Sequence, residues 1–147
     1  MSDDCIFCSI RDGDAESSVV YEDDQVISFM SLYPLRPGTF LVVPKQHTDH
    51  FTDIPDSVAA HMTIIANRFA RNAKERLQPR PLRMGMVVHG FSVAHAHLVV
   101  VPMHDSNDLT SKKYLGVRDG EIVDVGYTFD VPTRTELDAL AELIRAE

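Results

Sequence analysis

The chain has 147 residues, 44% of them hydrophobic and 24% charged, with a formal net charge of −8. This length is enough to bury a real core, and we expect a single domain over residues 1–147. The acidic balance argues against broad nucleic-acid binding, no apolar stretch is long enough to span a membrane, and residues 1–15 lack the pattern of a signal peptide, so the sequence predicts a cytoplasmic protein.

The two cysteines, Cys5 and Cys8, lie three positions apart near the N-terminus. Such a pair can be a redox pair, half of a metal site or two thiols without a role. A redox pair of the thioredoxin kind lies between a strand and a helix, and the sequence predicts no strand before Cys5. A metal site needs two further ligands, for which histidine is the natural candidate.

Three short apolar runs follow a polar turn. Residues 19–24 predict a strand that ends in a tight turn, and residues 26–30 predict a second strand, so that the two form a hairpin. Two prolines and a glycine in residues 33–38 predict a loop. Residues 39–44 are nearly all apolar, which is typical of a central strand, and a polar segment, residues 45–50, follows this strand.

The next segment predicts a long amphipathic helix. Asp56 or Ser57 can cap its start, and the helix reaches about Leu77. Its buried stripe recurs at three- and four-residue steps and consists of Val58, Met62, Ile65, Phe69 and Ala73. Prolines in residues 78–81 end the helix, and residues 82–88 predict a further strand.

Residues 93–102 predict a strand that carries two histidines, His95 and His97, on one face. The opposite face is wholly apolar and consists of Ala94, Ala96, Leu98 and Val100. Two imidazoles on an apolar strand must hydrogen-bond, bind a metal or react, because buried polar groups without partners are costly. Pro102 has no amide to donate, so we expect the strand to end there.

The rest of the chain carries no functional motif. Residues 104–113 predict a loop, residues 121–125 a short strand, and a terminal helix begins at Pro132 or Thr133. The residues expected to face inward from this helix are Leu137, Leu140, Leu143 and Ile144. The order of elements predicts an α+β fold, in which an antiparallel sheet carries one long helix on a face and a C-terminal helix is added.

Four segments, residues 5–8, 26–34, 37–47 and 90–102, resemble the histidine triad (HIT) proteins, which are nucleotide-binding hydrolases and transferases. The run Gly-x-Ser-Val-x-His-x-His, followed by an apolar stretch and a proline, is the most specific match. With the cysteine pair and Pro-Lys-x-His, it places the motif-bearing core at about residues 5–102 and leaves residues 103–147 as an extension of unassigned role. The resemblance implies a HIT-like fold that forms a homodimer.

The resemblance also implies a mechanism. His97 matches the histidine that attacks the α-phosphate of a nucleotide, giving a nucleotidyl-histidine that water or another acceptor resolves. A neutral imidazole is a good nucleophile near neutral pH. The backbone carbonyl of His95 matches the group that accepts a hydrogen bond from the nucleophile's ring, and Ser92 matches a serine that helps to hold the phosphate.

Two ligand sets follow from the same resemblance. Zinc-containing members with this N-terminal cysteine pair place their ligands at Cys5, Cys8, His47 and His95. Two thiolates and two imidazoles form a closed tetrahedral set, which is typical of structural zinc. The implied binding set for a nucleotide or nucleotide conjugate is Phe7, Ile10, Phe29, Met30, Ser31, Leu32, His89 and Ser92.

Four positions depart from the family pattern. Val99 replaces the third histidine of the triad, and Ser31 stands where an aspartate usually binds the ribose hydroxyls. Thr39 replaces a histidine, and Phe91 replaces the glutamine of a loop that is shortened here. Fewer donors to the phosphate weaken the electrostatic stabilisation that such a transfer needs.

Two functions therefore stay open. One is a nucleotidyl hydrolase or transferase with His97 as nucleophile. The other is a zinc-stabilised module that binds a nucleotide or another small molecule without useful turnover. Both predict zinc and a nucleotide-sized pocket, so a covalent nucleotide on His97 is the observation that separates them.

Overall fold

The computed structural model describes residues 5–88, 90–109, 115–124 and 131–146. Their fold is α+β, as predicted, around a five-stranded antiparallel sheet of order β1-β2-β3-β5-β4. The strands of this sheet are β1 (Val19–Glu22), β2 (Val26–Met30), β3 (Phe40–Pro44), β4 (Arg83–Val87) and β5 (Leu98–Met103). All five correspond to predicted strands, although several differ in their bounds.

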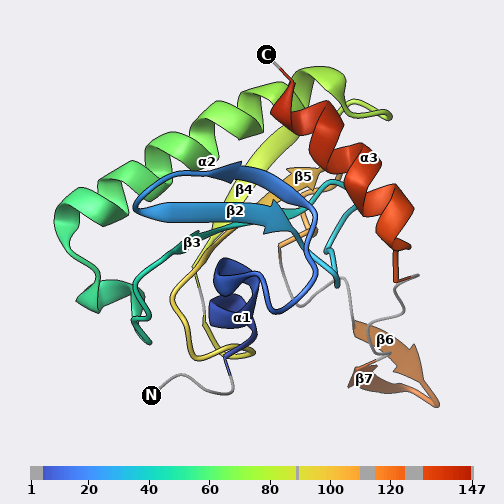
Figure 1. Cartoon of the computed structure of the whole chain (residues 1–147). Helices are drawn as coiled ribbons and strands as arrows, with labels where there is room; N and C mark the ends of the chain where they lie inside the picture. The colour runs from blue at the N-terminus through green and yellow to red at the C-terminus, as the bar shows by residue number, and fades with distance from the viewer. Residues whose placement is uncertain (1–4, 89, 110–114, 125–130, 147) are drawn as a thin grey trace.

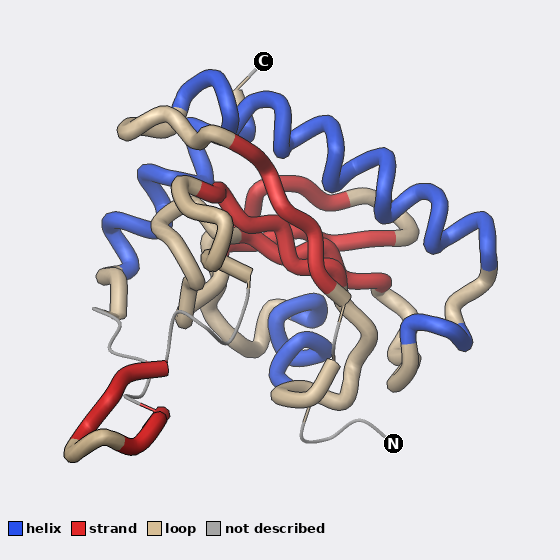
Figure 2. Tube along the Cα trace, turned by 180° about the vertical axis from the view of Figure 1, so that it is seen from behind, coloured by secondary structure: helices blue, strands red, loops and turns tan. Residues whose placement is uncertain are grey.

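Helices cover both faces of the sheet (Figures 1 and 2). The long helix α2 (Asp56–Arg76) lies along one face, and α3 (Arg134–Arg145) packs against α2 and the β1-β2 hairpin. The buried cluster between them contains Met62, Ile65 and Phe69 of α2, as predicted, and Leu137 and Ile144 of α3. A 3₁₀ turn, η1 (Phe51–Asp53), precedes α2.

The other face of the sheet is covered by a short helix that the sequence analysis did not predict, α1 (Ile6–Asp12). Phe7 and Ile10 of this helix pack on apolar residues of the sheet, among them Phe29 and Val99. Gly13 ends α1 with a left-handed backbone, φ 81°, a conformation that glycine adopts without strain. The helix places both cysteines beside the histidine segment.

The C-terminal part adds a hairpin that stands apart from the main sheet (Figure 1), formed by β6 (Leu115–Arg118) and β7 (Glu121–Asp124). We predicted β7 but not β6. Among the described residues, every helix is too short or too polar to cross a membrane.

The prediction of a strand over residues 93–102 was wrong at both ends. The strand begins at Leu98, which is paired with Val42, the last residue of β3 that pairs with β5. The segment before Leu98 is bonded elsewhere: the amide of Ala96 donates to the carbonyl of Thr48, 2.7 Å away. Ala94 is exposed instead of buried, and Pro102 lies within β5, where it is paired with Met84.

Two details of the helices also differ. Helix α2 begins at Asp56 after Pro55 and has no side-chain cap, so neither Asp56 nor Ser57 caps it. Helix α3 begins at Arg134, just after the predicted start at Pro132 or Thr133, and Thr133 caps it through a reciprocal pair of hydrogen bonds with Glu136. Leu143 does not face inward, since it is 39% exposed.

Candidate functional site

The two histidines lie in the extended segment that leads into β5, and each is fixed by a backbone carbonyl. The Nε2 atom of His95 lies 2.8 Å from the carbonyl oxygen of Pro44. The Nδ1 atom of His97 lies 2.7 Å from the carbonyl oxygen of His95 itself. Both rings are buried, with exposed fractions of 1% and 3%. These bonds set the orientation of both rings.

Carbonyl oxygens only accept hydrogen bonds, so the nitrogen facing each one must carry the proton. Burial is the largest influence on the pKa of His95 and lowers it, so that this ring is neutral near pH 7. The lone pair of His95 is then on Nδ1, which faces the cysteines. In the neutral tautomer of His97, the lone pair is on Nε2.

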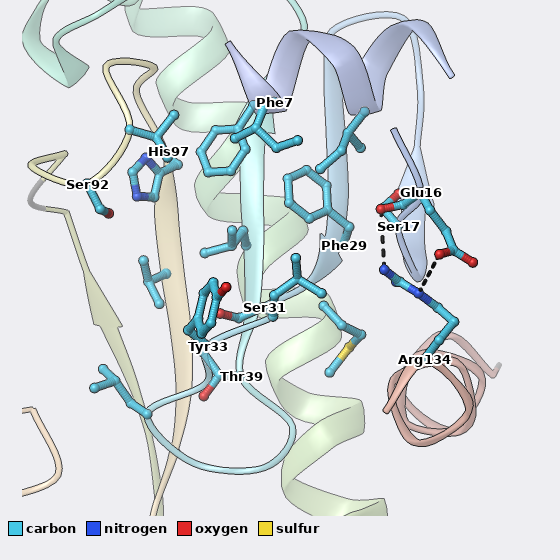
Figure 3. Close-up of a pocket in the computed structure, with 18 residues that line it drawn as sticks. Phe7, Glu16, Ser17, Phe29, Ser31, Tyr33, Thr39, Ser92, His97 and Arg134 are labelled. Atoms are coloured by element: carbon cyan, nitrogen blue, oxygen red, sulfur yellow. Dashed lines mark hydrogen bonds and ion pairs between the residues drawn. The ribbon is translucent and has the colours of Figure 1, made fainter. Parts of the chain in front are cut away.

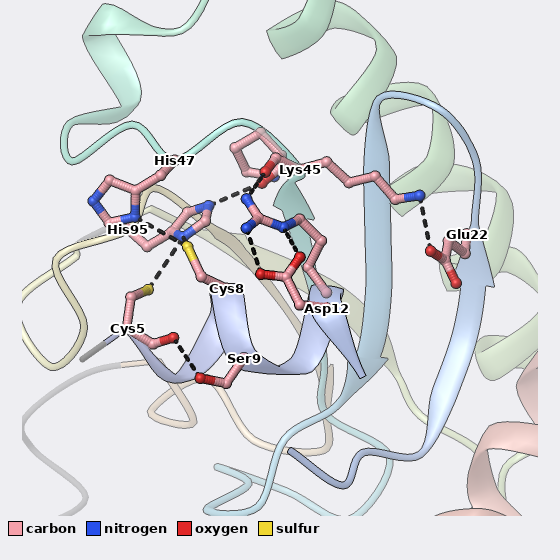
Figure 4. Close-up of polar contacts among 10 residues, drawn as sticks. Cys5, Cys8, Ser9, Asp12, Glu22, Lys45, His47 and His95 are labelled. Carbon is pink, nitrogen blue, oxygen red and sulfur yellow. Dashed lines mark hydrogen bonds and ion pairs between the residues drawn. The ribbon is translucent and has the colours of Figure 1, made fainter. Parts of the chain in front are cut away.

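Four residues from three distant segments form a candidate metal centre (Figure 4): Cys5, Cys8, His47 and His95. The Nδ1 atom of His95 lies 3.3 Å from Sγ of Cys5 and 3.6 Å from Sγ of Cys8. The Nδ1 atom of His47 lies 3.4 Å from Sγ of Cys8, and all four ligand atoms lie within 4.8 Å of one another.

The three sulfur–nitrogen distances, 3.3 to 3.6 Å, match the spacing of ligand atoms around a tetrahedral ion. Bonds of about 2.3 Å to sulfur and about 2.0 Å to nitrogen place neighbouring ligand atoms about 3.6 Å apart. The carbonyl of Pro44 orients the ring of His95 from its far side, as partners of metal-bound histidines commonly do. The four residues can therefore hold a metal ion. The pair Cys5 and Cys8 is joined by no disulfide.

A cavity of about 510 Å³ opens beside His97 (Figure 3). Its walls are mainly apolar. Phe7 lines it between His97 and Phe29, and the Phe7 ring meets the ring of His97 edge to face at 5.1 Å between centroids and that of Phe29 at 5.4 Å. The predicted binding residues that line it together with His97 are Phe7, Ile10, Phe29, Met30, Ser31, Leu32 and Ser92. His89 lies outside the described residues.

The positions that depart from the family pattern also contact this region. Val99 is 8% exposed and forms part of the cavity wall. Thr39 lines the cavity too, but its hydroxyl donates to the carbonyl of Arg36 at 2.6 Å and so is used within the loop. Phe91 is 96% exposed and borders a second cavity of about 220 Å³, which His97 also lines.

Among the polar cavity residues that sequence reasoning missed are Glu16, Ser17 and Arg134. Glu16 and Ser17 precede β1 in a segment without a motif. Arg134 is the first residue of α3, more than a hundred positions away along the chain. No local pattern in the sequence points to it, because the packing of α3 on the hairpin brings it there.

The sequence is similar to those of known proteins. A sequence model described as the HIT domain matches residues 12–106. An uncharacterized HIT-like protein of Mycobacterium tuberculosis is 32% identical over 123 residues, which are 78% of this chain and 81% of that protein. The match to the domain begins after the cysteine pair.

Solved structures share the fold. A Zn-bound histidine triad family protein from Mycobacterium smegmatis is 28% identical with a TM-score of 0.72, covering 97% of this chain and 91% of the other. A hypothetical histidine triad nucleotide-binding protein from Sulfolobus tokodaii has a TM-score of 0.72 over 96% of this chain and 89% of the other. At 21% identity, the latter likeness shows the fold alone.

Proposed function

Because this chain belongs to the histidine triad (HIT) family, we propose that it is a nucleotidyl hydrolase or transferase that acts at the α-phosphate of a nucleotide or nucleotide conjugate. The observation that carries the proposal is the position of His97. Its ring is held by the carbonyl of His95 and borders a cavity large enough for a nucleoside.

In the first step, Nε2 of His97 attacks the α-phosphorus. A phosphorus–nitrogen bond forms as the bond from phosphorus to the leaving group breaks, and the leaving group takes up a proton. The bond from Nδ1 to the carbonyl of His95 stabilises the positive charge that develops on the ring. In the second step, the oxygen of water or another acceptor attacks phosphorus, loses its proton and releases neutral His97.

Ser92 is the described residue placed to help hold the phosphate. It lines the same cavity as His97 and is exposed, so its hydroxyl can turn toward an anionic oxygen. The rings of Phe7 and Phe29 and the side chains of Ile10, Met30 and Leu32 supply apolar contact for the nucleoside. Ser31 lines the cavity between them and is the candidate partner of the sugar.

A second function is favoured by Val99 and Phe91. Val99 presents a methyl surface where the family pattern has a third imidazole, and Phe91 offers no donor. With fewer groups to stabilise charge on the phosphate, the protein would bind a nucleotide without useful turnover. The buried and oriented ring of His97 favours the enzyme, since binding alone does not need a nucleophile held in one tautomer.

We propose zinc as the ion at Cys5, Cys8, His47 and His95. Two thiolates and two imidazoles are the ligands that zinc prefers, and the set is closed, which is typical of a structural site. The zinc-bound relative from Mycobacterium smegmatis supports this choice. The ion would fasten α1 to the sheet and fix His95, whose carbonyl orients His97. A thiolate site of this kind suits a reducing compartment, consistent with a cytoplasmic location.

We also propose a homodimer formed through the β4 edge of the sheet. β4 is the last strand in the sheet order, and its side chains and those of its flanks include exposed apolar groups: Leu82 at 64%, Met86 at 37% and Val88 at 45%. An apolar edge strand is prone to pair with another strand. Ile64 of α2 is 63% exposed and adds to the apolar surface available to a second copy.

A substrate screen tests the proposed function. Nucleoside phosphoramidates, dinucleoside polyphosphates and nucleotide sugars are offered to the protein and to His97→Ala, with His61→Ala on α2 as a control histidine outside the cavity. We expect release of a nucleoside monophosphate that disappears in His97→Ala alone. Nucleotide binding without release from any class would favour the binding module.

A further inference from the structure

The cavity beside His97 has a second polar end, formed by Glu16, Ser17 and Arg134. Figure 3 shows His97 and Ser92 on one side of the cavity and these three residues on the other, with Phe7 and Phe29 between them. A nucleotide is built the same way, with its phosphate and its base at opposite ends of the sugar. A phosphate at His97 therefore directs the base toward Arg134.

Arg134 is held in place by contacts on several sides. Its Nη1 donates to Oγ of Ser18 at 2.8 Å, and Ser18 in turn donates to the carboxylate of Asp138 at 2.6 Å. Its Nη2 donates to the backbone carbonyl of Glu16 at 3.4 Å. The Arg134 side chain is 27% exposed and lines the cavity, so it is positioned by the protein and still reaches the cavity.

The pairing of Arg134 with the Glu16 carboxylate is loose. Its Nε lies 3.5 Å from Oε2 of Glu16, but this buried nitrogen makes no hydrogen bond within the described part of the chain. The Glu16 side chain is 75% exposed, and an ion pair of this kind contributes little. A ligand can therefore separate the two groups at small cost and gain a hydrogen bond from each.

We propose that Glu16 and Arg134 read the edge of a purine base and select guanine over adenine. The inference rests on the proposed function, because it takes the phosphate to lie at His97. It assigns a specificity role to α3, in the part of the chain that lies beyond the family motifs.

The reason is the order of donors and acceptors on guanine. O6 and N7 are two acceptors side by side, which a guanidinium contacts with two parallel hydrogen bonds. N1–H and the N2 amino group are two donors side by side, adjacent to O6, and match the two oxygens of a carboxylate. Adenine carries an amino group where guanine has O6, and it has no proton on N1. A neighbouring arginine and glutamate thus fit guanine better.

Binding of GMP and AMP to the full chain, measured by calorimetry, tests the inference without any turnover. We expect GMP to bind about tenfold or more tightly than AMP, since a bidentate contact to the edge of a base discriminates between bases by about this factor or more. Arg134→Ala should reduce the ratio to less than about threefold, mainly by weakening GMP. Arg145→Ala, at the far end of α3, is the matched control and should leave the ratio unchanged.

Glu16→Gln gives an independent test, because this exposed side chain can be changed without disturbing the fold. The substitution removes the negative charge that faces N1–H and the N2 amino group of guanine. It should therefore lower the preference for GMP and leave the binding of AMP nearly unchanged. Equal binding of GMP and AMP to the unmodified protein overturns the inference, as does a preference that survives both variants. Failure of the proposed function looks different: neither nucleotide binds, or His97→Ala leaves turnover intact.

Discussion

The carbonyl oxygen of His95 lies 2.7 Å from Nδ1 of His97, while the ring of the same His95 points its own Nδ1 at the two cysteines. One residue thus joins the candidate metal centre to the candidate nucleophile. Its side chain belongs to the first and its backbone orients the second. A change at the metal centre that moves His95 should therefore also change the orientation of the His97 ring, because the two residues are joined by the hydrogen bond from this ring to the His95 carbonyl.

Removal of the metal gives the first prediction. Protein purified without added metal should contain close to one zinc per chain, and Cys5→Ser with Cys8→Ser should abolish it. Chelation should lower the melting temperature by at least about 10 °C, because the binding energy of a structural ion is also folding energy. Elemental analysis and a thermal melt measure both effects, with Ser9→Ala on the same helix as the control. A metal-free protein with a Cys5–Cys8 disulfide would contradict the prediction.

The second prediction concerns the β4 edge. Light scattering at micromolar concentration should give twice the monomer mass of 16.5 kDa. Met86→Lys places a charge on the exposed edge and should shift the protein toward monomer, since burying an unpaired charge is costly. Val117→Lys, on the exposed surface of β6, should leave the mass unchanged. A monomeric unmodified protein would show the dimer proposal to be wrong.

The third prediction is a pH effect at the β1-β2 turn. Partial burial is the largest influence on Asp23 and raises its pKa, but hydrogen bonds from His61, from the amides of Val26 and Gln25 and from Tyr21 outweigh it and lower the pKa to about 2. The folded pKa is below the unfolded value of about 3.9. The carboxylate therefore stabilises the fold above about pH 4, and this contribution is lost as the pH falls toward 2.

Asp23→Asn should lower the unfolding free energy by about 1–2 kcal/mol at pH 7. The difference in unfolding free energy between the variant and the unmodified protein should become smaller as the pH falls from 4 to 2. Asp24→Asn, on the exposed neighbour, is the control. Urea unfolding across this pH range measures the difference. A difference in unfolding free energy that is independent of pH would mean that the carboxylate charge does not stabilise this turn.

The sequence predicted the main sheet because its strands are short apolar runs between clear turn residues. It failed at residues 93–97, where alternation alone could not reveal that the pairing with β3 stops at Val42 and that the amide of Ala96 donates to the carbonyl of Thr48 instead. Helix α1 was missed because it has only seven residues, although the spacing of Phe7 and Ile10 before Gly13 was a usable signal.

The candidate site was predictable where residues lie within one motif and not where packing assembles it. His95, His97 and the cysteine pair stand in short recognisable patterns, and the structure brings both cysteines, His47 and His95 together. Arg134 reaches the cavity only because Leu137 and Ile144 anchor α3 in the core. Such a contact depends on the whole fold, and no local spacing encodes it.

The fourth prediction concerns Val99, which faces the cavity from β5. Val99→His adds a donor there, and loss of one such donor commonly costs an enzyme about a hundred- to a thousandfold in rate. We expect phosphoramidate hydrolysis to rise at least about tenfold, with some loss of stability from burying a polar ring. Val99→Leu is the apolar control and should give no rise. A folded, zinc-containing, nucleotide-binding Val99→His protein without a gain would favour the binding module.

The proposed reaction requires a covalent bond between Nε2 of His97 and phosphorus. Intact-mass spectrometry of protein mixed with a nucleoside phosphoramidate and quenched within the first turnovers measures it. We predict a mass increase of one nucleoside monophosphoryl group, located on His97 by peptide mapping and absent from His97→Ala, while His61→Ala retains it. Release of nucleoside monophosphate at an undiminished rate from His97→Ala, with no adduct on the unmodified protein, would contradict a reaction through His97.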